Sequence, residues 1–324
     1  MDYLLLTCFA LSFLTAYILT PAWIKAAHKI ELTGKDMHKY DKPEIAEMGG
    51  LVVNAGFLMG VLTYIGLSTF YFKHSINLIY ILAAISTCLI IMLVGIMDDL
   101  LGWKIGLRQW QKPLLTSVAA LPLMAVNAGE SGMVLPMIGP VNFGILYPLL
   151  IVPVAITGAA NGFNMLAGLA GLEAGMGIII LGTLGFVAWQ TGSSWVAMLS
   201  LSMVFALLAF LKYNWHPAKI FPGDTFTYSV GALIATVAIL GNMERIAIAL
   251  FSLYFIEFLI KARTRFKGEC YGIPDKGGKL SPPINIESLT HVVMKLGRLK
   301  ETQVVLSILA LQVFLSFLIL FTML

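Results

Sequence analysis

Long apolar runs recur along this chain so closely that little sequence remains for a soluble domain. Windows of about 20 mostly apolar residues, enough to cross a bilayer, alternate with charged or Gly/Pro-containing breaks. We place ten such spans near residues 3–23, 50–72, 78–97, 113–128, 144–162, 172–190, 195–211, 226–241, 245–260 and 303–323.

Composition supports the same class of protein. Of the 324 residues, 59% are hydrophobic and 12% are charged, which leaves too little polar surface to cover a water-soluble globule. We therefore do not expect a soluble enzyme, a secreted disulfide scaffold or a nucleic-acid-binding protein. The predicted fold is an all-α integral membrane protein, with residues 1–324 forming one polytopic domain in the lipid bilayer.

The basic residues test the number of spans, because cytoplasmic loops carry most of the Lys and Arg in membrane proteins. With ten spans, 19 of the 21 Lys and Arg fall in loops on one side, and only Lys73 and Arg245 fall on the other. This asymmetry predicts ten transmembrane helices with both termini outside. The net charge of only +4 therefore hides a basic cytosolic face, which suits anionic lipids and anionic substrates.

One outer loop, residues 127–142, is punctuated by glycine and proline. Ser131-Gly132, Pro136 and Gly139-Pro140 surround short apolar pairs. The pattern predicts a turn or a small hairpin that caps the bundle, without a chemical role.

Three groups of acidic and amide side chains occur at the inner ends of predicted spans. They are Asp98 and Asp99; Asn161, Asn164 and Glu173; and Asp224. A carboxylate costs about 2.5–3.5 kcal/mol at mid-bilayer on the insertion scale, so each one near a span needs a reason. Their predicted side of the membrane also carries Lys104, Arg108, Lys112 and Lys219. Carboxylate and amide oxygens beside ammonium groups can hold a hard divalent cation and a phosphate, so these groups predict one shared site.

Each group alone also has a structural interpretation. Asp98-Asp99 could be a loop pair neutralised by a basic neighbour, and Asn161 and Asn164 could cap a helix. We interpret Glu257 as an interfacial or helix-paired carboxylate and not as a catalytic one. The occurrence of all the groups on one face favours the shared site.

Four motifs occur in a characteristic order. They are Ile96-Met97-Asp98-Asp99; Lys112; Asn161-x-x-Asn164-x-Leu-Ala-Gly-x-x-Gly-Leu-Glu-Ala-Gly; and Asn214-Trp215-x-Pro217-x-x-x-Phe221-x-Gly223-Asp224-Thr225. From Gly34 to Gln312 the chain resembles the polyprenyl-phosphate N-acetylhexosamine-1-phosphate transferases. Bacterial relatives usually have Asp where Ala167 stands, which favours the dolichyl-phosphate GlcNAc-1-phosphate transferase branch.

The resemblance implies a function for each motif. It implies Mg²⁺, with Mn²⁺ as an alternative, held by Asn164 and Asp224 together with the substrate pyrophosphate. Catalytic roles are implied for Asp98, Asp99 and Lys112. Substrate contacts are implied for five further residues, with Phe221 beside the uracil: Asn161, Glu173, Phe221, Arg263 and Arg265.

Two positions depart from the family pattern. The dolichyl branch often has an Asn where Ala170 stands, so uracil recognition must rest on other groups. The last inner loop usually carries an Arg/His-rich stretch that contacts the sugar phosphate, whereas here Arg263 and Arg265 occur without a His-Arg pair.

The expected reaction is transfer of N-acetylglucosamine 1-phosphate from UDP-N-acetylglucosamine to a polyprenyl or dolichyl phosphate, with release of UMP. Two alternatives are the same transferase acting on another UDP-N-acetylhexosamine, and an ion-coupled membrane transporter. The chain lacks the long insertion of animal members in its last inner loop. We therefore expect an archaeal cell membrane, or the endoplasmic reticulum membrane if the source is eukaryotic, with the active loops in the cytosol. The sequence leaves a homodimer open.

Overall fold

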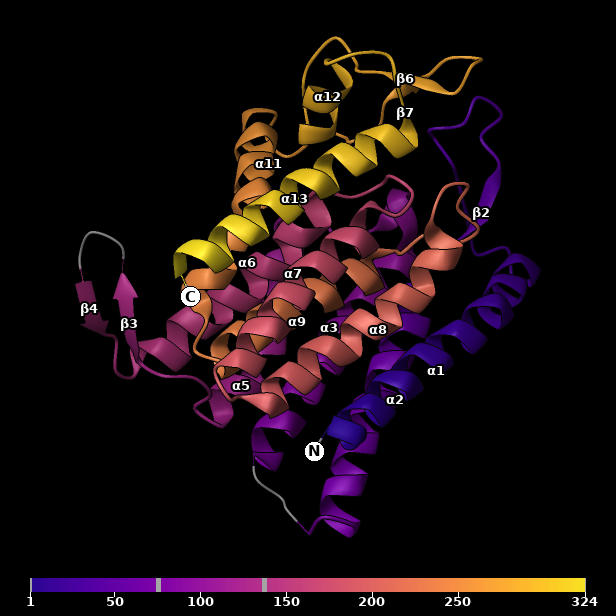
Figure 1. Ribbon diagram of the computed structural model, residues 1–324. Helices are drawn as coiled ribbons and strands as arrows, with labels where there is room; N and C mark the ends of the chain where they lie inside the picture. Colours follow the sequence, from indigo (N-terminus) through magenta and orange to yellow (C-terminus); the bar gives the residue numbers. More distant parts are fainter. Residues whose placement is uncertain (1, 74–76, 136–138, 324) are drawn as a thin grey trace.

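Long helices dominate the computed structural model, which describes residues 2–73, 77–135 and 139–323 (Figure 1). Seven helices of this described part are long and apolar enough to cross a membrane. They are α1 (Asp2–Lys29), α2 (Gly50–Phe70), α3 (Leu78–Ile105), a π-helical turn (Tyr147–Ile151) continued by α6 (Val152–Met165), α7 (Leu172–Gln190), α8 (Ser194–Asn214) and α13 (Glu301–Met323). The predicted class, a mostly helical membrane protein, is confirmed.

The other three predicted spans are short or interrupted. The segment predicted over 113–128 forms α4 (Gln111–Ser117), a 3₁₀ turn (Val118–Ala120) and α5 (Leu121–Ala125). Pro122 has no N–H to continue the α-helical ladder there. The eighth span corresponds to α9 (Asp224–Leu240), and the ninth is divided into α10 (Glu244–Leu250) and α11 (Ser252–Arg263). The count of ten crossings therefore stays a prediction.

Helix α3 extends beyond its predicted end. The apolar window ends at residue 97, but the helix continues to Ile105, so Asp98 and Asp99 lie within it. Backbone hydrogen bonds hold a helix together whatever the polarity of its side chains, and hydropathy marks only where the apolar part ends. The lysine predicted at the rim, Lys104, has a side chain outside the described part of the structure.

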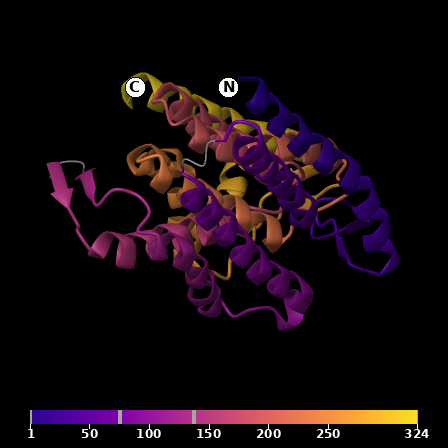
Figure 2. The same cartoon turned by 90° about the horizontal axis from the view of Figure 1, so that it is seen from below.

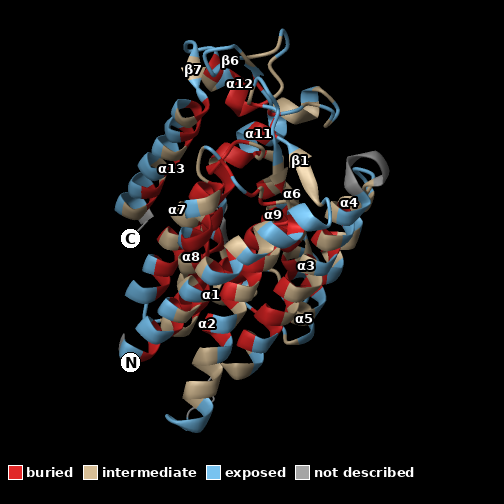
Figure 3. Ribbon diagram, turned by 90° about the vertical axis from the view of Figure 1, so that its right-hand side faces the viewer, coloured by how far each residue is buried: buried red, intermediate tan, exposed pale blue. Residues whose placement is uncertain are grey.

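Helix α9 forms the centre of the bundle. Every residue from Thr225 to Ile239 is buried, and α9 packs against α2, α3, α6, α7 and α8 (Figure 3). A helix buried on all sides needs no polar face. Its approach to α6 is close at Gly231, where an added Cβ would lie 2.4 Å from the carbonyl oxygen of Ala159. The spacing of α6 and α9 is therefore fixed by a glycine.

Small sheets lie at the two ends of the bundle. One end carries the hairpin of β1 (Thr33–Lys35) and β2 (Glu44–Ala46), the sheet of β5 (Ile273–Pro274), β6 (Lys279–Ser281) and β7 (Leu299–Lys300), and the short helix α12 (Leu289–Met294). The other end carries the hairpin of β3 (Gly132–Leu135) and β4 (Gly139–Asn142), which projects from the bundle (Figure 2). This confirms the predicted hairpin, although Pro136 in its turn lies outside the described residues.

Candidate active site

A cleft of about 400 Å³ opens at the end of the bundle that carries β1 and β2. Four segments line it: the β1–β2 hairpin with its turn (residues 36–43) and the residue after β2, the α6–α7 loop (residues 166–171) with the end of α6 and the start of α7, the α8–α9 segment (residues 215–223) with the start of α9, and the chain from the end of α11 onward. Their lining residues include Lys35, Asp36, Glu47, Asn164, Glu173, Phe221, Asp224, Thr227, Lys261 and Tyr271. The cleft thus joins residues that are far apart in the sequence.

A lysine bridges two carboxylates at this cleft. The Nζ of Lys112 lies 2.7 Å from Oδ2 of Asp98 and 3.3 Å from Oδ2 of Asp224. Asp98 is buried, and both of its oxygens are occupied: Tyr228 Oη donates to Oδ2 at 3.1 Å, and the N–H of Leu107 donates to Oδ1 at 3.0 Å. The structure therefore brings together residues of α3, α4 and α9 that the sequence places in separate motifs.

The charge on Lys112 is stabilised by its surroundings. Burial lowers the pKa of its ammonium group, but the carboxylates of Asp224 and Asp98 outweigh burial, so the pKa lies above the ordinary lysine value. The Lys112 side chain is 26% exposed; it is not among the described residues that line the cleft, but its partner Asp224 is. Lys112 is therefore a protonated donor at neutral pH, held in place by its two partners.

Asp99 is bound to the start of α9. Its two oxygens accept hydrogen bonds from the N–H of Asp224 at 2.7 Å, and from the N–H and Oγ1 of Thr225 at 2.9 and 2.5 Å. A carboxylate at a helix N-terminus accepts hydrogen bonds from the free N–H groups and is attracted by the positive end of the helix dipole. Gly223, with φ of 75°, allows this approach, since an added Cβ would lie 2.8 Å from an Asp99 oxygen. Asp99 therefore fixes the backbone that carries Asp224.

Two oxygen-bearing side chains fit a magnesium ion. Asn164 at the end of α6 and Asp224 at the start of α9 both line the cleft, and Asn164 Oδ1 accepts a hydrogen bond from Thr227 Oγ1 at 3.0 Å. In the described residues no three His, Cys, Asp or Glu side chains form a metal cluster of their own. Magnesium needs only one or two protein carboxylates or carbonyl oxygens when substrate phosphates and waters complete its shell, so this donor set is compatible with it.

Comparisons with known proteins identify the family of this chain. The family model described as glycosyl transferase family 4 matches residues 78–242, from the start of α3 to just beyond α9. A Saccharolobus solfataricus protein, provisionally named UDP-N-acetylglucosamine–dolichyl-phosphate N-acetylglucosaminephosphotransferase, is 41% identical over 298 residues, which cover 91% of this chain and 89% of the relative. The chain belongs to glycosyl transferase family 4.

Other members of the family are similar over most of their length. A Dictyostelium discoideum protein named UDP-N-acetylglucosamine–dolichyl-phosphate N-acetylglucosaminephosphotransferase is 28% identical over 92% of this chain and 83% of its own length. A Clostridium botulinum phospho-N-acetylmuramoyl-pentapeptide-transferase is 30% identical over 78% of this chain and 79% of its own length. The family predicted from the motifs is confirmed.

The remaining predicted substrate residues of this family member occupy different environments. Glu173 lines the cleft; its Oε1 accepts from the N–H of Gly168 at 2.7 Å, while its buried Oε2 has no partner among the described residues. Phe221 lines the cleft wall. The amide of Asn161 instead donates to Thr116 Oγ1 at 2.8 Å, which ties α6 to α4.

The two predicted arginines lie away from the cleft lining. Arg263 donates to the carbonyl oxygen of Ile286 at 2.5 Å and is exposed, and Arg265 is also exposed, with φ of 54°. Neither is among the described residues that line the cleft. Contact of Arg263 and Arg265 with substrate therefore stays a prediction.

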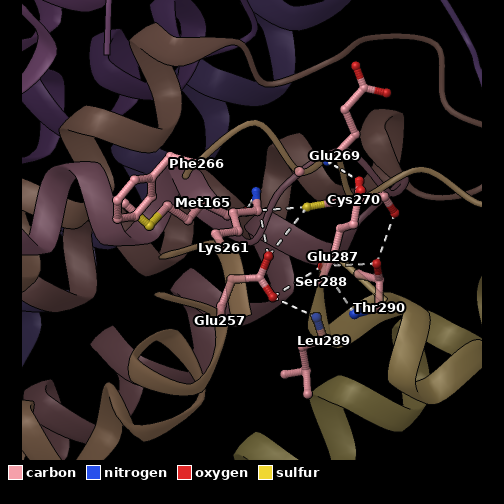
Figure 4. A network of polar contacts seen from close by, with 12 residues as sticks. Met165, Glu257, Lys261, Phe266, Glu269, Cys270, Glu287, Ser288, Leu289 and Thr290 are labelled. Carbon is pink, nitrogen blue, oxygen red and sulfur yellow. Dashed lines mark hydrogen bonds and ion pairs between the residues drawn. The ribbon is translucent and has the colours of Figure 1, made fainter. Parts of the chain in front are cut away.

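A buried network around Glu257 supports one wall of the cleft (Figure 4). Glu257 is fully buried; its Oε2 accepts from the N–H of Leu289 at 2.6 Å and from Ser288 Oγ at 3.1 Å, and its Oε1 lies 3.5 Å from Nζ of Lys261. Lys261 in turn donates to the carbonyl oxygen of Met165, the last residue of α6. The helix-paired interpretation of Glu257 is correct, and the pair anchors the end of α6.

Several cleft residues were not predicted from the sequence. Lys35, Asp36, Glu47, Lys261 and Tyr271 line the cleft but belong to none of the assigned motifs. For the first three a signal existed, because the charged stretch between the first two spans was expected on the same side as the other groups. The placement of Lys261 depends on the packing of α11 against α6, which the sequence does not reveal.

Proposed function

We propose that this protein transfers N-acetylglucosamine 1-phosphate from UDP-N-acetylglucosamine to a polyprenyl or dolichyl phosphate and releases UMP. The observation that carries the proposal is the Lys112 ammonium, held between Asp98 and Asp224, because Asp224 lines the cleft together with Asn164. The names of the Saccharolobus and Dictyostelium relatives support the same donor and acceptor. We propose N-acetylglucosamine, the sugar in the names of these relatives, as the sugar that this protein transfers. The alternative donor is another UDP-N-acetylhexosamine.

The proposed reaction exchanges one phosphoanhydride for another. An oxygen of the lipid phosphate attacks the β-phosphorus of the UDP-sugar, a new P–O–P bond forms, and the bond to the UMP oxygen breaks with its electron pair remaining on UMP. A phosphate monoester has its second pKa at about 6, so the lipid phosphate is mostly ionised at neutral pH. Catalysis then depends on positioning and on neutralising charge.

Each residue has a defined role in this proposal. Lys112 donates to diphosphate oxygens and counters the charge that develops on the leaving UMP. Asp98 is assigned to orient Lys112, because its Oδ2 lies 2.7 Å from the Lys112 ammonium and is fixed there by Tyr228; a role as general base is the alternative. Asp99 positions Asp224 through the start of α9. Magnesium, when bound by Asn164 and Asp224, would withdraw charge from the diphosphate oxygens.

An exchange assay tests the proposed function. Labelled UMP, incubated with purified protein, magnesium and the sugar-diphospholipid in detergent, is expected to appear in UDP-N-acetylglucosamine without ATP, because the bond broken and the bond made are of the same kind. A transporter would need two compartments and would form no UDP-sugar in detergent. A parallel panel of UDP-sugars identifies the donor. If the forward reaction proceeds and UMP never exchanges, direct phosphosugar transfer is wrong.

We also propose that the chain crosses the membrane ten times, with both termini outside the cell. The cleft would then open on the cytosolic side of the cell membrane, and the source would be an archaeon. The basic residues support this orientation, and the relatives from Saccharolobus and Sulfolobus are archaeal proteins. A single cysteine replacing Lys276, near the β5–β6 turn, is expected to react with a membrane-impermeant reagent only after cell lysis. A cysteine replacing Glu130, near the β3–β4 hairpin, should react in intact cells. Both variants are made after removal of the three native cysteines. Equal labelling of the two positions in intact cells would contradict the topology.

A further inference from the structure

The α6–α7 loop, one wall of the cleft, is held by side chains from three different helices. The N–H of Gly168 donates to Glu173 at 2.7 Å, that of Ala170 donates to Oε1 of Glu301 at 2.8 Å, and that of Gly171 donates to Oδ1 of Asn214 at 3.1 Å. A buried loop without strand or helix partners must satisfy its N–H groups in this way. The shape of this wall therefore depends on acceptors outside the loop.

Glu301 differs from the other two acceptors because it binds two further walls, whereas Asn214 binds one, at the carbonyl oxygen of Ile220. Its Oε2 lies 2.6 Å from Nζ of Lys39 in the β1–β2 turn and 3.0 Å from Nδ1 of His216 in the α8–α9 segment. Its side chain is only 3% exposed, whereas that of Lys39 is 22% exposed. One carboxylate thus joins three segments that line the cleft.

Each segment joined by Glu301 contains residues that line the cleft close to the residue that Glu301 binds. Asp36 and Met37 precede Lys39, Leu169 precedes Ala170, and Phe221 follows His216 in the same segment. Asp36 Oδ2 also lies 3.4 Å from the Lys39 ammonium, which couples the turn further to Glu301. A shift of Glu301 would therefore move opposite sides of the cleft relative to each other.

We propose that Glu301, the first residue of α13, is a positioning residue that sets the width of the cleft for the nucleotide-sugar. The inference rests on the proposed function and names a residue outside the matched span 78–242. Glu301 touches no reacting atom in this role. It acts on binding of the donor through the three segments and leaves the Lys112 and Asp224 machinery unchanged.

The test compares Glu301→Gln with wild type. The amide keeps the size of the side chain but loses the charge that holds Lys39, so we expect the KM for UDP-N-acetylglucosamine and the inhibition constant of UMP both to rise about tenfold. The kcat should stay within about twofold, because only binding shared by ground and transition states is lost. The KM for the lipid phosphate should not change. A fall in kcat with an unchanged KM would overturn the positioning role.

A structural readout and a matched control accompany the kinetics. Hydrogen exchange of peptides covering residues 36–43 and 166–171 is expected to accelerate in Glu301→Gln. Glu244→Gln is the control, because Glu244 is also a buried carboxylate, bonded to Tyr147 Oη near the opposite end of the bundle. Glu244→Gln should change neither the hydrogen-exchange rates of these two peptides nor the KM for UDP-N-acetylglucosamine. Equal acceleration in both variants would show a general loss of stability and would contradict the proposal.

Binding and a second variant separate the possible failures. If wild type binds no UMP in calorimetry, the proposed function is wrong; if wild type and Glu301→Gln bind UMP equally, only the positioning role is wrong. Should Glu301→Gln not fold, Lys39→Met removes the same ion pair from its more exposed partner, and we expect about a threefold rise in KM. In the double variant the two effects on KM should be less than additive, because both substitutions remove the same ion pair between Lys39 and Glu301. An unchanged KM in Lys39→Met would overturn the inference.

Discussion

Asp224→Asn is expected to lower turnover by about a thousandfold, the largest effect of a single substitution in this protein. The amide preserves the size of the side chain at the start of α9 but removes the negative charge that faces Lys112 and the proposed magnesium ion. UMP release, measured across magnesium concentrations together with thermal unfolding, should show a higher half-saturating magnesium concentration and little change in Tm. Chelation of magnesium should abolish activity in wild type.

A matched control for this variant is Asp275→Asn. Asp275 is a carboxylate in the β5–β6 turn, away from the lining of the cleft, where it accepts from the N–H groups of Gly277 and Lys279. It should retain full turnover. Asn164→Ala provides the second ligand test and should also lose most activity. Full activity of Asp224→Asn with unchanged magnesium dependence would refute metal binding by that residue.

Lys112→Ala is expected to slow the forward and the reverse reaction by the same factor, about a hundredfold or more. The change removes the ammonium that neutralises the diphosphate and leaves Asp98 and Asp224 facing each other without a cation between them. A catalyst cannot alter an equilibrium, so the forward and the reverse kcat/KM must fall by the same factor. Initial rates of UMP release and of labelled UMP incorporation measure the two directions. Lys276→Ala, in an exposed turn, is the control and should change neither rate.

A loss of less than about threefold would mean that another cation neutralises the diphosphate. Lys35 and Lys261 also line the cleft, but the Lys261 ammonium is already bound to Glu257 and to the end of α6.

The sequence predicted the long helices well because each long apolar run must find partners or lipid. It missed the extension of α3 to Ile105, because a hydropathy window stops at the first charged residues while the hydrogen-bond ladder continues. It also could not divide 113–128 into α4 and α5, or 245–260 into α10 and α11, since these breaks depend on local backbone geometry. Span boundaries were therefore less predictable than the existence of the helices.

For the candidate site, the sequence predicted which motifs meet but not how each residue is used. Asp98 and Asp99 are neighbours with similar side chains, yet one binds Lys112 and the other binds the start of α9. Consecutive helical residues point about 100° apart, so their partners differ, and those partners lie in α4 and α9, far along the chain. Glu301 gave no signal of its own, because its three partners come from three separate loops.

The glycine contact between α6 and α9 has a consequence for how this protein can vary. Asn164 and Asp224 stand at the cleft ends of these two helices, and Gly231 allows the helices to approach within the bundle. Any larger residue there must push the helices apart, and the displacement would reach both side chains at once. The residues that Gly231 can be exchanged for are therefore limited by the chemistry at Asp224, two helical turns away. Even an apolar replacement at this buried position can inactivate the enzyme.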